Sequence, residues 1–339
     1  MKKIDTRQAV GHVLCHDMTR IVPGEMKDAQ FRKGHVVREE DIPVLLSMGK
    51  EHLFVWENDE SMLHENDAAE ILLDLCLGPH MSRSQVKEGK IEVFADVDGL
   101  FEVDVERLNQ VNGLGEMMIA TRGNRFPVKK GDKLAGTRII PLVIEKEKME
   151  AARKVAGEQP LLKISPYRQK KVGVIVTGSE IFSGRIEDRF GPVMEKKLAQ
   201  YDPVFLGKKI AGDDPEDIAR HIEDFLKQGA ELILCTGGMS VDPDDTTPTA
   251  IKSTGARIVT YGAPVLPGAM FLLAYTKEGV PIMGLPGCVM YSRRTIFDIV
   301  LPRIMAGQTL TLEELTTLGA GGLCLDCDVC IYPNCGFGR

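Results

Sequence analysis

The sequence lacks several features that would place it in a special class of protein. Its 339 residues contain no long apolar run. The longest uncharged stretch, Ile258 to Thr276, is interrupted by two glycines and two prolines, so it predicts loop and strand rather than a membrane helix. The residues after Met1 have no apolar segment of the kind that an export signal needs, and we therefore expect a cytoplasmic protein. No internal repeat or low-complexity segment is apparent.

Concentrated positive charge is missing as well. Lys and Arg total 42 against 49 Asp and Glu, which gives a net charge of -7, and the basic residues are dispersed. This balance argues against nucleic acid as the main partner, and we expect no membrane partner either. Apolar residues make up 43% and are enough to form a sizeable core. The length corresponds to two or three domains at about 150 residues each.

Cysteine is the unusual component of the composition, with eight residues. Three lie in apolar contexts that predict core positions, and a fourth follows a glycine turn: Cys15, Cys76 and Cys235, and then Cys288. The remaining four, which we call the tail cysteines, are Cys324, Cys327, Cys330 and Cys335. Without an export signal they indicate a metal site before disulfide bonds. Their two x₂ spacings followed by x₄ resemble iron-sulfur ligation, although the bacterial ferredoxin run has x₃ and then proline after its fourth cysteine. Four thiolates would equally hold zinc, and a free or redox-active thiol tail is the third alternative.

The C-terminal half has the pattern of a mostly parallel α/β sheet. From Lys171 to Arg303, short apolar strands alternate with glycine turns and amphipathic helices, which predicts a sheet covered on both faces. The clearest helix has Asp214 as its N-cap, Pro215 in its first turn and Gly229 after its end. Another helix is expected from Cys288 towards Pro302. The expected strands are residues 172–176, 203–208, 231–235, 258–261 and 281–285.

The residues before this block follow other patterns. Residues 1–57 mix short strands with a helix at 39–48, and residues 60–80 have the pattern of one helix. Residues 88–144 alternate apolar and polar positions between glycines, which predicts an antiparallel β module. We therefore expect four segments: an α+β region at 1–80, a β-rich module with a linker at 81–165, an α/β domain at 166–310 and a cysteine-rich tail at 311–339.

Three glycine turns follow expected strands of the C-terminal half. They are Thr177-Gly178-Ser179-Glu180, Thr236-Gly237-Gly238-Met239-Ser240 and Leu285-Pro286-Gly287. The carboxyl ends of parallel strands share one edge of a sheet, where ligands bind, and free backbone N–H groups there suit phosphate. One such turn alone is about as often plain turn geometry. Three together favour a phosphorylated ligand.

An acidic loop follows the second turn. Asp242, Asp244 and Asp245 lie within four residues, and hard carboxylate oxygens suit Mg²⁺. Alternatively, Asp245 caps the next helix, with Pro248 in its first turn. Glu180, with Asp188 farther along the chain, adds acids that the sheet would bring to the same place.

These motifs resemble those of the MoeA/MogA molybdopterin-binding family. The matching segments, in order, are residues 177–181, 184–188, 211–216, 236–241 with Asp245, and 284–287. The resemblance implies a three-layer α/β domain of the MogA type, preceded by a mixed α+β and β-rich region like that of MoeA. The N-terminal similarity is looser and rests on residues 5–17, 31–35 and 40–42.

The resemblance implies a role in molybdenum cofactor biosynthesis. The activity would be that of a molybdopterin molybdenumtransferase, which binds adenylylated molybdopterin and inserts molybdate with release of AMP in the presence of Mg²⁺. Alternatives are a non-catalytic carrier or sensor of molybdopterin or the finished cofactor, a MogA-like molybdopterin adenylyltransferase, and hydrolysis of a pyrophosphate bond as in the competence-damage domain. The family also implies a homodimer, with molybdoenzymes or cofactor-assembly proteins as partners.

The same resemblance assigns roles position by position. Three acids become candidate catalytic residues, namely Asp245, Glu180 and Asp188, and Asp245 with Asp242 would bind Mg²⁺. The implied ligand contacts are Thr177, Gly178, Ser179, Asp213, Gly237, Gly238, Ser240, Leu285, Pro286 and Gly287. This chain departs from MoeA members at Ser179, Asp242 and Cys288, where they usually carry Asp, Gly and Asn. The cysteine tail follows where those proteins continue into a C-terminal β domain.

Overall fold

The computed structural model describes residues 2–22, 26–55, 61–240, 242–243 and 245–338. The chain forms two compact units. The first comprises Met1–Asp96, Val103–Arg122 and Gly131–Lys163, and the second comprises Val97–Glu102, Gly123–Lys130 and Ile164–Arg339. The two units alternate along the chain, so each of them is made of three separate segments. Among the described helices, none has the length and apolar character needed to cross a membrane.

The first unit contains an antiparallel sheet with the order β6-β7-β11-β9. Its strands are β6 (Met81–Arg83), β7 (Lys90–Ala95), β11 (Lys133–Ile139) and β9 (Met117–Thr121). The helices of this part are α2 (Glu65–Cys76), α3 (Val105–Gly113) and α4 (Lys146–Ala156). The alternating pattern predicts this antiparallel pairing, but it does not predict α3, which interrupts the β-rich module.

The N-terminal residues of this unit form short elements around a small apolar core. They are β1 (Lys2–Asp5), β2 (Met18–Val22), β3 (Met26–Phe31), α1 (Asp41–Ser47) and β4 (His52–Val55). The helix expected over residues 60–80 is wrong at its start, because Met62–His64 form strand β5, paired with β12 (Val143–Glu145). The His64 side chain accepts a hydrogen bond from the Asn66 amide and so caps α2.

The second unit is built on a six-stranded sheet with the order β15-β14-β16-β19-β18-β17. The strands are β14 (Lys171–Thr177), β15 (Val204–Ala211), β16 (Leu232–Thr236), β17 (Arg257–Tyr261), β18 (Leu272–Tyr275) and β19 (Pro281–Leu285). The first four strands in this order are parallel, and β18 and β17 add an antiparallel edge. The prediction of a mostly parallel sheet is confirmed, although β18 is an additional strand.

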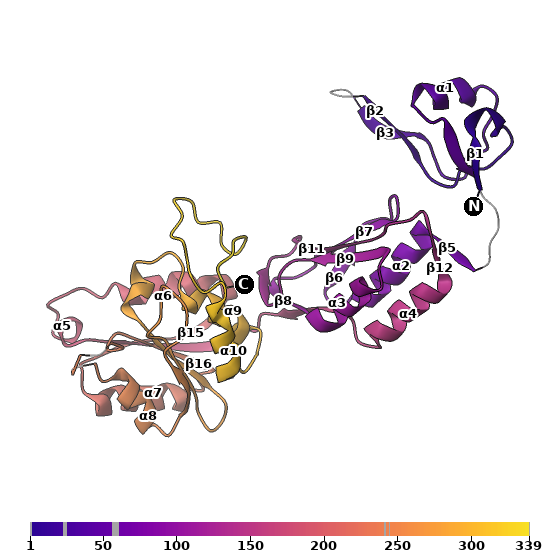
Figure 1. The fold of residues 1–339 in the computed structure, drawn as a ribbon. Helices are drawn as coiled ribbons and strands as arrows, with labels where there is room; N and C mark the ends of the chain where they lie inside the picture. Colours follow the sequence, from indigo (N-terminus) through magenta and orange to yellow (C-terminus); the bar gives the residue numbers. More distant parts are fainter. Residues whose placement is uncertain (1, 23–25, 56–60, 241, 244, 339) are drawn as a thin grey trace. The chain divides into compact units, whose positions relative to one another are not determined.

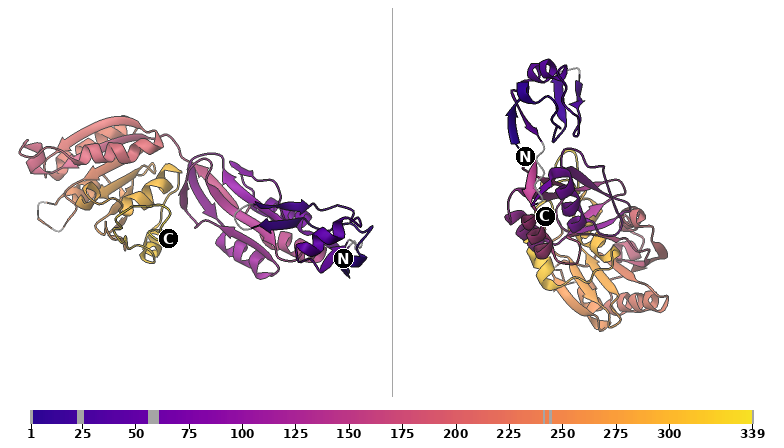
Figure 2. Two further views of the ribbon diagram at one scale, coloured as in Figure 1. Left: turned by 90° about the horizontal axis from the view of Figure 1, so that it is seen from above. Right: turned by 90° about the vertical axis from the view of Figure 1, so that its right-hand side faces the viewer.

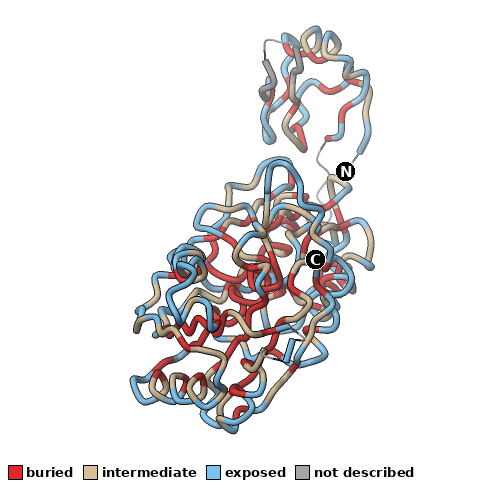
Figure 3. Tube along the Cα trace, turned by 90° about the vertical axis from the view of Figure 1, so that its left-hand side faces the viewer, coloured by how far each residue is buried: buried red, intermediate tan, exposed pale blue. Residues whose placement is uncertain are grey.

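Helices cover both faces of this sheet (Figure 1). On one face, α6 (Phe190–Leu198) and α9 (Ile296–Met305) pack on alternate strand residues such as Val174. On the other face lie α7 (Pro215–Lys227) and α8 (Thr247–Ser253). Buried residues run through the strands in the interior of the unit (Figure 3). The expected α/β class is therefore confirmed.

Two helix starts differ from the expectation, and one agrees with it. As predicted, α7 has Asp214 as its N-cap. The helix expected from Cys288 is divided. Residues Gly287–Met290 form one 3-10 turn, and α9 begins after its N-cap Thr295, which forms a capping box with Asp298 in the first turn. Helix α8 has Thr246 as its N-cap. The Asp245 carboxylate therefore does not cap α8 and is left for other contacts.

A three-stranded sheet with the order β10-β8-β13 completes the second unit. Its strands are β10 (Phe126–Val128), β8 (Gly99–Val103) and β13 (Leu162–Pro166). The Glu102 carboxylate accepts hydrogen bonds from Ser165 Oγ at 2.7 Å and from Gln308 Nε2 at 2.6 Å. After α9 the chain forms α10 (Leu312–Thr316) and then the cysteine tail, drawn in yellow in Figures 1 and 2.

Candidate functional site

The carboxyl ends of four parallel strands meet at one edge of the second unit's sheet. In the strand register, Thr177 of β14 is level with Ala211 of β15. Val176 of β14 is level with Thr236 of β16, which in turn is level with Leu285 of β19. The three glycine turns therefore begin side by side along this edge.

The first two turns leave the sheet towards opposite faces. After β14 the chain passes to α6 on one face, whereas after the neighbouring strand β16 it passes to α8 on the other. Open parallel sheets bind ligands at such a point, because the diverging connections leave the strand ends accessible between them. The position between β14 and β16 is thus the place where this topology favours a ligand.

The turns after β14 and β16 are locked together by hydroxyl groups. Thr247 Oγ1 donates to the Gly237 carbonyl at 2.9 Å. The Thr177 hydroxyl lies 3.2 Å from both the Thr236 carbonyl and Thr247 Oγ1 and can donate to either acceptor. A Cβ atom on Gly237 would lie 2.3 Å from the Thr177 carbonyl oxygen, and the φ angle of Gly237 is +91°. Only glycine allows this approach, so the two backbones form one rigid surface at the switch point.

Asp213 connects the loop after β15 to both of these turns. Its Oδ2 atom accepts a hydrogen bond from the Ser179 amide at 3.0 Å. Its main-chain carbonyl accepts a bond from Thr246 Oγ1 at 2.6 Å. A residue predicted to contact the ligand therefore also holds the surrounding loops in position.

Asp245 is oriented by the glycine turn that precedes it. The Ser240 amide donates to Asp245 Oδ2 at 2.9 Å, and the Asp245 amide donates to the Asp242 carbonyl at 2.9 Å. Asp242 is exposed and Asp245 is half-buried. Asp244 and Val241, which belong to the predicted acidic loop, lie outside the described residues.

Tyr261, at the end of β17, supports this loop from the antiparallel edge of the sheet. Its hydroxyl lies 3.0 Å from the Met239 carbonyl and 3.3 Å from the Ser240 carbonyl, to which it donates. Burial and the negative charge of Asp245 raise the pKa of Tyr261, so the phenol keeps the proton that makes these bonds. The sequence gives no sign of this role, because Tyr261 reaches the loop only through the pairing of β17 with β18.

Asp188 lies at the start of α6, where its carboxylate is already engaged. It accepts hydrogen bonds from the Phe190 and Gly191 amides at 2.8 and 3.0 Å and forms an ion pair with Lys208 at 2.6 Å. Burial alone would raise the pKa of Asp188, but the bonds to Lys208 and to the two amides hold it below the ordinary value. These contacts fix α6 against β15. Glu180, by contrast, is exposed on the short helix α5 (Ser179–Phe182).

The third turn continues the edge beside β16. Leu285 and Pro286 are buried and Gly287 is exposed. At the end of β19, Gly284 leaves room for Met239 of the second turn, since a Cβ atom there would lie 2.6 Å from the Met239 sulfur. Cys288 is half-buried, and burial raises the pKa of its thiol, so it is not an activated thiolate. Cys15, Cys76 and Cys235 are buried, as predicted.

The described residues at this edge provide carboxylates for a metal ion but do not form a complete coordination site. Within the described ranges, no three His, Cys, Asp or Glu side chains stand together as a group that could hold a metal ion. Mg²⁺ is commonly bound by one or two carboxylates together with substrate phosphates and water, so a complete protein cage is not required. Asp245 and Asp242 fit that role by their donor atoms. Cys324 and Cys335 are half-buried, whereas Cys327 and Cys330 are exposed.

Two segments of the chain match known families. Residues 173–306 match the model described as "Probable molybdopterin binding domain", and residues 3–57 match "Domain of unknown function (DUF8806)". The MoeA-like arrangement expected for the N-terminal region therefore stays a prediction.

Curated relatives match over a short stretch. The chain is 34% identical over 77 residues to a CinA-like protein of Mycobacterium tuberculosis (strain ATCC 25177 / H37Ra), covering 23% of this chain and 18% of that protein. It is 30% identical over 95 residues to a CinA-like protein of Mycobacterium avium (strain 104), covering 28% of this chain and 22% of that protein. The chain thus spans about a fifth of the length of these curated relatives.

Solved structures of two MoaB proteins also resemble part of the chain. The molybdopterin biosynthesis enzyme MoaB of Thermus thermophilus is 20% identical with a TM-score of 0.34, covering 41% of this chain and 98% of that chain. The tungsten cofactor synthesizing protein MoaB of Pyrococcus furiosus is 22% identical with a TM-score of 0.31, covering 36% of this chain and 84% of that one. By this family match, residues 173–306 are similar to the probable molybdopterin-binding domain.

Proposed function

We propose that the second unit binds adenylylated molybdopterin at the carboxyl edge of β14, β16 and β19 and exchanges its AMP for molybdate with the help of Mg²⁺. This is the activity of a molybdopterin molybdenumtransferase in molybdenum cofactor biosynthesis. The observation that carries the proposal is the Asp245 carboxylate, held at 2.9 Å by the Ser240 amide in a glycine turn that is itself locked to the turn after β14.

The turns would hold the ligand by close approach of the backbone. Gly178, Gly237 and Gly238 carry no side chain that would keep a phosphate from the main chain. Thr177 and Ser179 on the first turn, Ser240 on the second, and Leu285-Pro286-Gly287 on the third would surround the ligand. Asp213 would position the first two turns through its bonds to Ser179 and Thr246.

The acids would divide into metal ligands and supporting groups. Asp245 and Asp242 would hold Mg²⁺, which when bound offsets the charge between the pyrophosphate link and the incoming oxyanion. Glu180 is exposed at the first turn and free to face the ligand as the second catalytic candidate. For Asp188 the ion pair with Lys208 supports a positioning role, because its carboxylate already has three partners.

A turnover assay tests this function directly. The full chain is incubated with adenylylated molybdopterin, Mg²⁺ and molybdate, and AMP is measured over time. We expect AMP release that requires both molybdate and Mg²⁺. Asp245→Ala should lower the rate by about 10²-fold or more, as expected when an oriented charged group at a reacting centre is lost. Glu223→Ala, which removes an exposed acid from α7, is the matched control and should leave the rate unchanged.

Other outcomes identify the alternative functions. AMP release that needs no molybdate indicates hydrolysis of the pyrophosphate bond. Adenylylation of molybdopterin from ATP indicates a MogA-like adenylyltransferase, and tight binding without turnover indicates a carrier or sensor. Unchanged AMP release by a folded Asp245→Ala variant would contradict the role given to Asp245.

A further inference from the structure

The cysteine tail encloses a cavity of about 200 Å³ in the second unit. All four tail cysteines line it, together with Arg293 and Arg294 from the segment before α9. Apolar side chains such as Leu325, Ile331 and Phe337 complete its wall. The spacing in the sequence predicts that the four thiols lie near one another, and in the structure all four line the same cavity.

The tail is anchored to the unit on both sides of the cysteines. The Cys324 amide donates to the Leu266 carbonyl at 2.8 Å, and the Leu266 amide donates to the Gly322 carbonyl at 2.8 Å. At the other end, the Gly338 amide donates to the Gly321 carbonyl at 2.9 Å, and Phe337 is only 5% exposed. The cysteines are therefore presented by a closed loop whose two ends are fixed.

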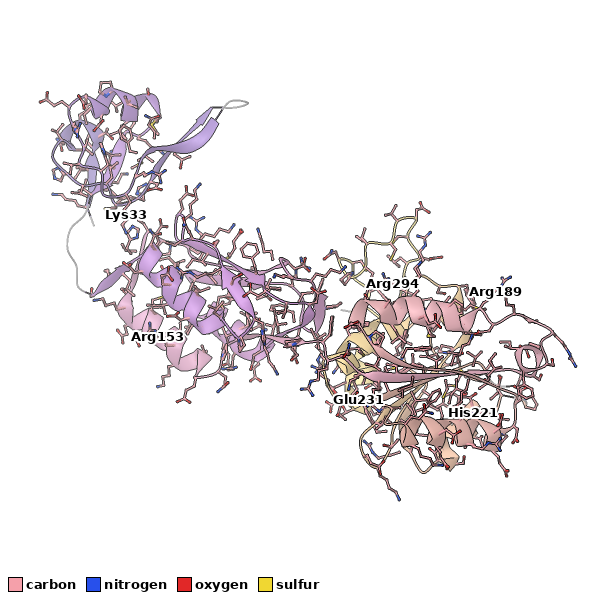
Figure 4. The ribbon with its side chains drawn as sticks, turned by 180° about the vertical axis from the view of Figure 1, so that it is seen from behind. Lys33, Arg153, Arg189, His221, Glu231 and Arg294 are labelled. Carbon is pink, nitrogen blue, oxygen red and sulfur yellow. The ribbon has the colours of Figure 1, made fainter. Side chains whose placement is uncertain are left out.

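Two guanidinium groups bring positive charge to the thiols. Arg293 Nη1 donates to the carbonyl oxygens of Cys327 and Asp328 at 2.8 and 2.6 Å. The Arg294 guanidinium lies 4.9 Å from the centre of the Tyr332 ring and lines the same cavity as Cys330. Figure 4 labels Arg294 near the base of the tail loop. Asp326 is the one acid among the residues that line the cavity, where it stands against two guanidinium groups. Arg294 also forms an ion pair with Asp298 at 2.9 Å, so Arg293 is the cation left to face an anionic group.

The cavity that the four thiols line is larger than the space that a single ion needs. In a zinc site each sulfur lies about 2.3 Å from the ion, so four sulfurs close around it and leave no comparable space. Within the part of the chain that the structure describes, no three cysteines are gathered closely enough to hold one ion. All four nevertheless face the same cavity. A group larger than one ion, with several metal atoms, fits this arrangement.

The spacing of the first three tail cysteines supports one kind of metal group. The run Cys324-x₂-Cys327-x₂-Cys330 corresponds to the three closely spaced ligands of a bacterial [4Fe–4S] site. In two-cluster ferredoxins the fourth cysteine of that run binds the other cluster, whereas Cys335 here lines the same cavity as the first three. We propose that the tail cysteines together hold one [4Fe–4S] cluster in this cavity.

Cluster loading needs no net oxidation or reduction. A preassembled cluster on a thiol-containing donor exchanges its ligands, so that each iron loses one donor thiolate and gains one tail-cysteine thiolate. The proton of each cysteine passes to the departing thiolate, and the iron oxidation states do not change. The arginines offset the negative charge that the four thiolates bring to the cluster.

Metal analysis of the full chain tests the proposal. The protein is purified without oxygen, and iron, acid-labile sulfide and zinc are measured, with visible absorbance and electron paramagnetic resonance after dithionite reduction. We expect about four irons and four sulfides per chain, with the spectra of a [4Fe–4S] cluster. Cys327→Ser and Cys335→Ser should each lose most of the iron. Cys288→Ser, which removes a half-buried thiol outside the tail, should keep it.

Several results would overturn the assignment. One zinc per chain without iron, or tail disulfides without metal, would contradict the cluster. Full iron content in Cys335→Ser would contradict its place as fourth ligand. Circular dichroism shows whether each variant is folded, and the iron content of the unaltered protein decides the question if a variant is not. Because no molybdopterin is involved, this result is independent of the proposed transferase activity.

Discussion

The hydroxyl groups of Thr177 and Thr247 lie 3.2 Å apart although the residues are 70 positions apart in the chain. Thr177 is the last residue of β14, and Thr247 is the first residue of α8. The contact joins the two connections that diverge from the sheet, at the place where the ligand is proposed to bind. Its geometry depends on the glycines between these threonines, which makes those glycines the natural targets for mutation.

Gly237→Ala should destabilise the protein and weaken ligand binding. The new Cβ atom would lie 2.3 Å from the Thr177 carbonyl oxygen at a φ angle of +91°. Left-handed strain and overpacking together predict a loss of about 3 kcal/mol or more in the free energy of unfolding. Urea denaturation measures this loss.

Gly279→Ala separates the effect of left-handed backbone strain from that of overpacking. Gly279 has a similar φ angle of +83°, but nothing lies within 4 Å of a Cβ atom built on it. Its substitution should therefore cost only about 1 kcal/mol of backbone strain. Equal losses in the two variants would show that the close approach of the turns is unimportant.

Tyr261→Phe should loosen the loop that carries Asp245. The substitution removes the hydroxyl that bonds the Met239 and Ser240 carbonyls and keeps the ring. We expect a loss of about 0.5–1.5 kcal/mol in unfolding free energy and a larger rise in KM for adenylylated molybdopterin than fall in kcat. An unchanged KM would place Tyr261 outside the ligand site.

The Asp188–Lys208 ion pair should make stability depend on pH in the acid range. Contacts with Lys208 and two amides lower the pKa of Asp188 in the folded state below the ordinary value of 3.8. Its contribution is therefore complete above 3.8 and is lost as the pH falls through the folded-state pKa. Asp188→Asn should lower the free energy of unfolding by about 1–2 kcal/mol at neutral pH. The side-chain oxygen of asparagine can still accept from the main-chain amides at the start of α6, but a neutral side chain cannot form an ion pair with Lys208.

A double-mutant cycle with Lys208→Met checks that assignment. If the pair carries the effect, the second substitution should add little to the first, and the coupling should disappear in acid. Chemical denaturation at several pH values measures both. Coupling that persists below the folded-state pKa of Asp188 would assign the effect to other groups.

Arg294→Gln should shift the properties of the proposed cluster. Loss of a positive charge beside the cavity should make the reduction potential more negative and speed cluster loss in air. Asp298 would keep its ion pair with Lys197 at 2.8 Å, so the fold should remain. Lys252→Gln, an exposed change on α8, controls for net charge. A potential that is equal in the two variants would exclude Arg294 from the cluster environment.

The α/β unit could be largely predicted from its sequence because local signals agree there with the packing. Strong apolar runs predict β14, β16 and β19. The start of α7 follows from Asp214 and Pro215, which provide the cap and the first turn. The glycine turns also follow from the strands, since parallel strand ends must share an edge.

Other features depend on contacts between distant residues. The residues after Cys288 are apolar enough for a helix, but the Thr295–Asp298 capping box moves the start of α9 to Ile296. Asp245 has the spacing of a helix cap, yet its carboxylate bonds Ser240 because Thr246 takes the cap position. Tyr261 could not be assigned to the site without the pairing of β17 and β18. The tail cavity likewise depends on Arg293 and Arg294, which precede α9.

The interleaving of the two units along the sequence limits where the chain can be cut without removing parts of the second unit. A fragment starting at Ile164 would leave β13 without β8, Gln308 without the Glu102 carboxylate and Glu314 without Arg125. Such a fragment would expose the edge of β13 and leave the side chains of Gln308 and Glu314 without these partners. The α/β unit therefore needs residues 97–102 and 123–130, which lie within the sequence of the first unit, to complete its three-stranded sheet.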